Sequence, residues 1–119
     1  KAPLMFIGHQ VGTPGPALQL LEKMISAMGS KIQDVTLVNI PNSADGNAET
    51  VRSILQKFRP SVVVTLGNLG FPRGKNIELE GAQLIPSLHP EELLKKVALK
   101  KEAWEDLKIA MKFLNWMPR

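Results

Sequence analysis

Polar and glycine residues stand at the end of each apolar run in this chain, where they could contact a ligand. Gly8, Asn39, Asn68 and His89 occupy these positions. A histidine so placed can donate a hydrogen bond to an atom that gains negative charge, and an asparagine side chain offers one acceptor and two donors. These residue types suit a site that reads the polar edge of a ligand and stabilises charge on it.

His89 also has a purely structural interpretation, as the residue that caps a helix. Pro90 suits the first helical position, and Glu91 and Glu92 favour the positive end of the helix. We favour this interpretation over catalysis. A metal site made by His9 and His89 is conceivable, but no nearby carboxylate supports it, so we expect no metal site.

The other candidates have equally simple structural interpretations. Asn39 could satisfy backbone groups at the end of a strand, and Gly8 and Gly12 could be ordinary turn glycines. Basic side chains can contact DNA phosphates or remain solvated surface charges, and the candidates are Arg59, Arg73 and Lys75.

Apolar runs alternate with amphipathic helical patterns along the chain. Residues 4–7, 35–40 and 61–66 predict strands, of which 4–7 and 61–66 are expected to be buried, and residues 77–85 predict a hairpin that turns at Glu80 and Gly81. Helices are expected between the strands, and the last helix is expected over residues 98–116. The residues predicted on the inner helix faces are Leu18, Leu21, Met24, Ile25 and Met28, then Val51, Ile54, Leu55 and Phe58, then Trp104, Leu107, Met111 and Leu114.

This alternation favours an α/β fold, because parallel strands need crossover connections. We expect a three-layer α/β/α sandwich around a central, mainly parallel four-stranded sheet, with residues 4–7 in its interior. No break in composition divides the chain, so residues 1–119 are predicted to form a single domain. Ligands bind beyond the carboxyl ends of strands in such sheets, so the polar residues at those ends are predicted to surround one depression.

Composition favours a protein that is not embedded in a membrane. The apolar fraction is 44%, and no apolar run approaches the roughly 18 residues that span a bilayer. The first residues lack the long apolar core of a signal peptide, so a cytoplasmic location is expected. The net charge of +4 fits contact with nucleic acid, although many basic proteins have no such contact.

Segments spread along the whole chain, and in the right order, resemble the family-4 uracil-DNA glycosylases of bacteria and archaea. Residues 6–12 are similar to the first motif of that family, and residues 37–40 resemble the strand with its uracil-contacting asparagine. Residues 58–68 look like the central RPKVIVALGN strand, and residues 85–90 are similar to the IPTYHP motif with the catalytic histidine. Shorter likenesses follow at residues 73–75 and 101–107.

The resemblance implies a uracil-DNA glycosylase-like fold and a set of site residues. His89 matches the catalytic histidine and Asn39 the asparagine that reads uracil. Gly8 and Gly12 match the glycines of the first motif, and Asn68 lies in the segment that resembles the central strand. These five residues would contact the substrate or lie close to it. Arg59, Arg73 and Lys75 would then contact DNA phosphates.

The chain also departs from the family pattern at several chemical groups. His9 stands where the family has glutamate, and no acidic residue occurs in the first 21 residues. The loop over residues 12–16 is short and lacks the phenylalanine that stacks on uracil in the family. No cysteine is present, so the four ligands of the iron–sulfur cluster are missing and no cofactor is expected.

Two functions are consistent with this mixture of matches and losses. We expect a catalytically degenerate domain of the superfamily that is associated with DNA or acts as an adaptor, as the psi subunit of the bacterial replicative clamp loader does. The alternative is a divergent DNA glycosylase that hydrolyses the N-glycosidic bond of uracil or another damaged base with His89 and Asn39. The expected partners are single- or double-stranded DNA and a replication or repair protein.

Overall fold

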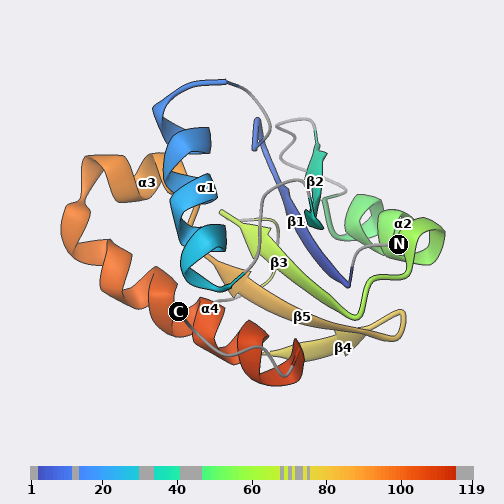
Figure 1. The fold of residues 1–119 in the computed structure, drawn as a ribbon. Coiled ribbons are helices and arrows are strands. Elements are labelled where there is room, and N and C mark those ends of the chain that lie inside the picture. Colours follow the sequence, from blue (N-terminus) through green and yellow to red (C-terminus); the bar gives the residue numbers. More distant parts are fainter. Residues whose placement is uncertain are drawn as a thin grey trace.

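The computed structural model describes residues 3–11, 14–29, 34–40, 47–67, 69, 71, 74 and 76–114. In these residues the strands are β1 (Leu4–Gly8), β2 (Thr36–Asn39), β3 (Val62–Leu66), β4 (Ile77–Leu79) and β5 (Ala82–Ser87). They form one sheet in the order β2-β1-β3-β5-β4 (Figure 1). Only β4 is antiparallel to its neighbour. The α/β class and the interior position of the first strand are confirmed.

The expected number of strands is wrong by one, because the described sheet has five strands rather than four. The predicted hairpin forms, and its first arm, β4, pairs with β5 and extends the edge of the sheet. Glu80 and Gly81 connect the two arms with φ angles of 51° and 83°. Positive φ at both central residues is the geometry of the tight turns that join hairpin strands.

Helices cover both faces of the sheet. The described helices are α1 (Pro16–Ala27), α2 (Asn47–Phe58), α3 (Pro90–Lys95) and α4 (Lys100–Leu114), with a short 3-10 turn, η2 (Val97–Leu99), between the last two. The last helix therefore begins two residues later than predicted, and its predicted end at residue 116 lies outside the described residues. None of these described helices has the length and apolar character needed to cross a membrane.

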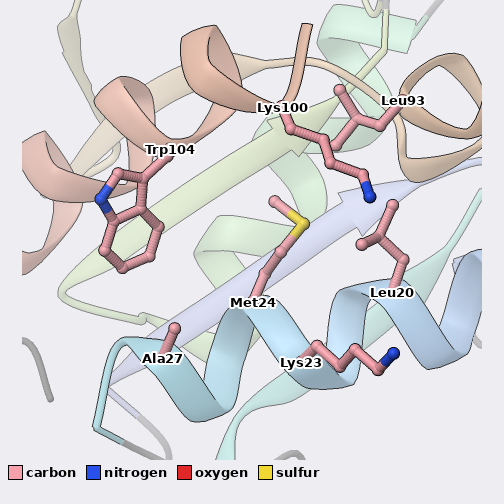
Figure 2. Close-up of a pocket in the computed structure, with 7 residues that line it drawn as sticks. All are labelled: Leu20, Lys23, Met24, Ala27, Leu93, Lys100 and Trp104. Carbon is pink, nitrogen blue, oxygen red and sulfur yellow. The ribbon is translucent and has the colours of Figure 1, made fainter. Parts of the chain in front are cut away.

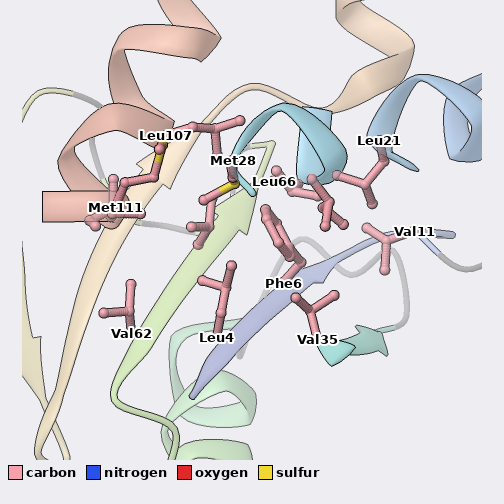
Figure 3. Close-up of a cluster of buried hydrophobic side chains, with 14 residues drawn as sticks. Leu4, Phe6, Val11, Leu21, Met28, Val35, Val62, Leu66, Leu107 and Met111 are labelled. Atoms are coloured by element: carbon pink, nitrogen blue, oxygen red, sulfur yellow. The ribbon is translucent and has the colours of Figure 1, made fainter. Parts of the chain in front are cut away.

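A large apolar cluster fills the space between the sheet and the helices α1 and α4 (Figure 3). Leu4 and Phe6 point into it from β1, because alternate residues of a strand face the same side. Trp104 of α4 is half-buried and packs against it. Its buried members, called here the α1/α4 cluster, are Leu4, Phe6, Val11, Leu21, Ile25, Met28, Val35, Val62, Val64, Leu66, Ile85, Leu107, Ala110 and Met111.

The opposite face of the sheet packs against α2. Met5 and Ile7, the other alternate residues of β1, are buried there with Val51 and Leu55 of the helix. The prediction that Phe58 also faces inward is wrong, because its side chain is 42% exposed. Phe58 is the last residue of α2, where the chain leaves the sheet face, and the Lys57 ammonium lies 5.6 Å from its ring centre.

The order of the strands places a topological reversal next to β1. The chain passes from β1 through α1 to β2 on one side, then returns through α2 to β3 on the other side of β1. The carboxyl end of β1 therefore leads to α1, whereas that of β3 leads toward β4 at the far edge of the sheet, with no described helix between them. Crevices in open α/β sheets form at such a reversal.

Candidate functional site at the carboxyl edge of the sheet

The sheet brings three of the predicted site residues to one edge. Gly8 is in register with Asn39 on one side and with Leu66 on the other, and Leu66 is in register with Ser87. His89 follows this last strand by two residues. Gly8, Asn39 and His89 therefore share the carboxyl edge, as predicted. The other predicted residues, Gly12, Asn68, Arg73 and Lys75, lie outside the described residues.

Gly8 stands where β1 and β3 approach too closely for a side chain. A Cβ atom at this position would lie 2.8 Å from the Leu66 carbonyl oxygen and 2.8 Å from Cγ1 of Val11. Real Cβ atoms essentially never show contacts this short. The Leu66 oxygen belongs to the backbone of a buried strand and cannot move away without disturbing the sheet. The glycine is therefore needed for packing, whatever its role toward a ligand.

We expect Gly8→Ala to lower the free energy of unfolding by about 1–3 kcal/mol, the usual penalty for overpacking a core. Urea denaturation monitored by circular dichroism measures this loss. Removing one of the two contacts by Val11→Ala should make Gly8→Ala less costly in a double-mutant cycle. The matched cycle with Leu55→Ala, which lies in the α2-facing cluster, should show additivity. If Gly8→Ala lowered the free energy of unfolding by the same amount in the native chain and in Val11→Ala, the packing explanation would be contradicted.

Both ring nitrogens of His89 have backbone partners. Nδ1 accepts a hydrogen bond from the Glu91 N–H at 3.1 Å, and Nε2–H donates to the His9 carbonyl oxygen at 2.5 Å. This pattern fits the neutral imidazole with its proton on Nε2. The side chain is only 7% exposed. A ring held in this way has no N–H left to offer to a substrate.

His89 is the N-cap of α3 and forms a capping box. Its ring covers the first turn, while the Glu92 carboxylate accepts a hydrogen bond from the His89 backbone N–H at 3.1 Å. Pro90 occupies the first helical position, as predicted from the sequence. The reciprocal pair satisfies two backbone donors that the start of a helix leaves without partners. The structural interpretation of His89 is confirmed.

His9 links the first two strands at the same edge. Its Nδ1 lies 3.1 Å from the Ile40 carbonyl oxygen, to which it can donate a hydrogen bond. The His9 backbone receives the bond from His89, so β1, the end of β2 and the start of α3 are connected through two histidines. Within the part of the chain that the structure describes, no group of three or more metal-ligating side chains occurs.

A buried polar pair behind this edge escaped the sequence analysis. The Ser87 hydroxyl donates to Oδ2 of Asp106 at 2.9 Å, and the two residues are 2% and 6% exposed. The pair ties the end of β5 to α4 and so helps to fix the segment that carries His89. A signal was present, because Asp106 lies three residues after Ala103 and four before Ala110 on the buried stripe of α4.

Arg59 does not lie with the other candidates. It follows α2 and precedes β3, and the neighbouring Ser61 N–H donates to the Pro3 carbonyl oxygen just before β1. Arg59 is thus at the amino edge of the sheet, opposite to His89. Its side chain is exposed, which leaves it able to contact a phosphate, but not one held at the carboxyl edge.

A small hollow of about 160 Å³ lies beside the carboxyl edge, between the starts of α1 and α3. It is smaller than the roughly 300 Å³ that pockets for small molecules usually reach. No aromatic ring lines it, and Glu91 contributes the only carboxylate among the described lining residues. The lining residues are Gln10, Pro14, Gly15, Pro16, Ala17, Glu91 and Leu94.

The described part of the edge can therefore present backbone groups and Asn39, which is exposed at the end of β2. Its one buried histidine caps a helix. No protein-family model matches the chain, and no curated protein matches it.

Proposed function

We propose that this chain is a catalytically degenerate domain of the uracil-DNA glycosylase type that acts by binding. It would contact DNA directly or serve as an adaptor for a protein that acts on DNA. The observation that carries the proposal is the double engagement of the His89 ring, whose nitrogens bond to Glu91 and His9. The histidine that the resemblance matches to catalysis is used here to hold the fold together.

The arrangement of the elements supports the glycosylase part of this proposal. The reversal of strand order beside β1, helices on both faces and a glycine needed at the end of β1 are consistent with a three-layer glycosylase-like sandwich. Five of the six sequence segments that resemble family 4 overlap these elements in the family's order, and the segment at residues 73–75 lies on none of them. The fold class alone allows many functions, so the proposal depends on the segments together with the edge that they form.

The missing groups support the loss of catalysis. Breaking a glycosidic bond requires charge to be stabilised on the sugar and on the departing base together. On the sugar side, His9 replaces the acidic residue and its ring nitrogen faces the Ile40 carbonyl oxygen. On the base side, the hollow at the edge has no aromatic ring among its described lining residues, and a stacking ring contributes about 1–3 kcal/mol per base.

We expect the chain to excise little or no uracil. Loss of a positioned acid–base group alone lowers a rate by about 100- to 10,000-fold. Single- and double-stranded oligonucleotides with one uracil should be incubated with the native chain and with His89→Ala, and abasic sites counted after alkaline cleavage. Both proteins should give the background level. Robust excision by the native chain that disappears in His89→Ala would support the alternative of a divergent glycosylase.

A binding measurement separates the two non-catalytic roles. Direct contact with DNA predicts an affinity that falls steeply as salt rises, because bound phosphates release counterions. Fluorescence anisotropy with labelled oligonucleotides at several salt concentrations measures this slope, and Arg59→Glu tests the exposed arginine at the amino edge. An adaptor role predicts no measurable dependence of DNA affinity on salt, and the same anisotropy result for Arg59→Glu as for the native chain. Excision must be absent in either case.

A further inference from the structure

We propose that the groove between α1 and α4 binds an acidic segment of a partner protein that inserts one large apolar side chain. This inference extends the adaptor branch of the proposed function to a specific surface. Peptide binding at the groove requires neither glycosylase ancestry nor the absence of excision. The groove proposal and the proposed function can therefore fail independently of each other. The groove lies on the side of α1 that faces α3 and α4.

One wall of the groove is a stripe of α1 that is only partly buried. Leu20, Met24 and Ala27 recur at the spacing of one helix face, and they point toward α3 and α4 (Figure 2). Leu93 of α3 and Trp104 of α4 close the opposite wall. Figure 2 shows the Met24 side chain rising between the two walls toward Trp104 and Lys100.

The size of the groove selects the kind of occupant. Its volume is about 210 Å³, below the roughly 300–1,000 Å³ of pockets that hold cofactors and drug-sized ligands. A space of this size suits a single leucine, methionine or phenylalanine side chain. Protein interfaces concentrate their binding energy in such anchors, which fill pockets at the centre of the contact.

The charges around the groove indicate which residues should flank the apolar side chain of the occupant. Lys23 and Lys100 line it, and none of its described lining residues is acidic. Glu92 of α3 and Glu105 of α4 are engaged elsewhere, because Glu92 bonds to the His89 backbone and Glu105 lies 2.8 Å from the Lys108 ammonium. An apolar floor between two cations is complementary to an apolar residue flanked by acids.

The same features disfavour DNA as the occupant. A duplex presents phosphates along its surface and would contact the two lysines, but it has no aliphatic side chain to fill the floor lined by Leu20, Met24 and Leu93. Nucleic acid would be favoured by exposed rings on which bases could stack. Trp104 is half-buried and packs against the α1/α4 cluster instead.

The test uses the fluorescence of Trp104 in the full chain. Trp116→Phe leaves Trp104 as the single tryptophan, so a ligand that fills the groove should shift its emission to shorter wavelength. The probe is the acidic peptide EDEFLDE, compared with its neutral counterpart QNQFLNQ and with EDEAADE, which lacks the anchor. We expect EDEFLDE to bind with a dissociation constant below about 1 mM, and each control peptide to bind at least about tenfold more weakly.

Charge reversal on exposed residues tests the location without disturbing the core. Lys23→Glu with Lys100→Glu should weaken binding of EDEFLDE at least about tenfold. Lys57→Glu with Lys112→Glu makes the same change in net charge away from the groove and should alter the affinity by less than about twofold. Circular dichroism confirms that each variant is folded.

Four results would overturn the proposal. They are the failure of EDEFLDE to bind below about 1 mM, equal binding of QNQFLNQ, equal loss in the two charge-reversal pairs, and displacement of EDEFLDE by an oligonucleotide. Sedimentation equilibrium adds a fifth, because a dimer that Met24→Glu dissociates would assign the groove to a second copy of this chain.

Discussion

Replacing Phe6 by alanine is expected to lower the free energy of unfolding by about 3–5 kcal/mol, the usual cost of removing a buried aromatic side chain. Phe6 is 0% exposed and lies within the α1/α4 cluster, on β1 in the interior of the sheet (Figure 3). Its neighbours come from both sheet and helices, so they cannot close the cavity by a small shift. A single domain has only about 5–15 kcal/mol of stability to lose.

Phe58→Ala is the matched control, because the same atoms are removed from a side chain that is 42% exposed. We expect it to lower stability by less than about 1 kcal/mol, as surface substitutions usually do. Urea denaturation of both variants, followed by circular dichroism, measures the difference. Similar losses in the two variants would mean that β1 is not the centre of the core.

His89→Ala is expected to lower the free energy of unfolding by about 2–4 kcal/mol. The loss has two parts, since the ring accepts from the Glu91 N–H and donates to the His9 carbonyl oxygen. Removing an N-cap costs about 1 kcal/mol, and leaving a buried group without its partner costs about 1–3 kcal/mol. Chemical denaturation measures the total, and the excision assay should show no accompanying change.

His89→Asn separates the two parts. Asparagine is a preferred N-cap and can still accept from the start of α3, but its side chain is too short to replace the contact with the His9 carbonyl. We expect His89→Asn to recover about 1 kcal/mol relative to His89→Ala. If His89 had no structural role, His89→Ala and His89→Asn would both have the stability of the native chain. That result would contradict the capping role of His89.

The alternation of apolar runs and amphipathic patterns was sufficient to predict the fold class. Residues 4–7 and 62–64 are unbroken apolar segments because β1 and β3 are covered on both faces. The cap at His89 was also predictable, since Pro90 and the acidic pair after it form a local signal. These features depend on residues that are close in the chain, which is why the sequence displays them directly.

The position of a residue at the end of an element was less predictable. Phe58 continues the apolar pattern of α2, yet it is exposed at the last residue of that helix. Arg59 is next to a strand in the sequence, but the direction of the strand puts it at the amino edge. Periodicity indicates which face of a helix is apolar. It does not indicate where along the helix the packing against the sheet ends.

The amino-acid sequence by itself determined the order of the elements, the hairpin turn at Glu80 and Gly81, and the residues that stand at the ends of the strands. Only the tertiary structure decided what those residues touch. The bond from His89 to the His9 carbonyl joins positions 80 residues apart, and the Ser87–Asp106 pair joins β5 to α4. Such contacts depend on how packed elements are placed in three dimensions, and local propensity carries no information about that placement.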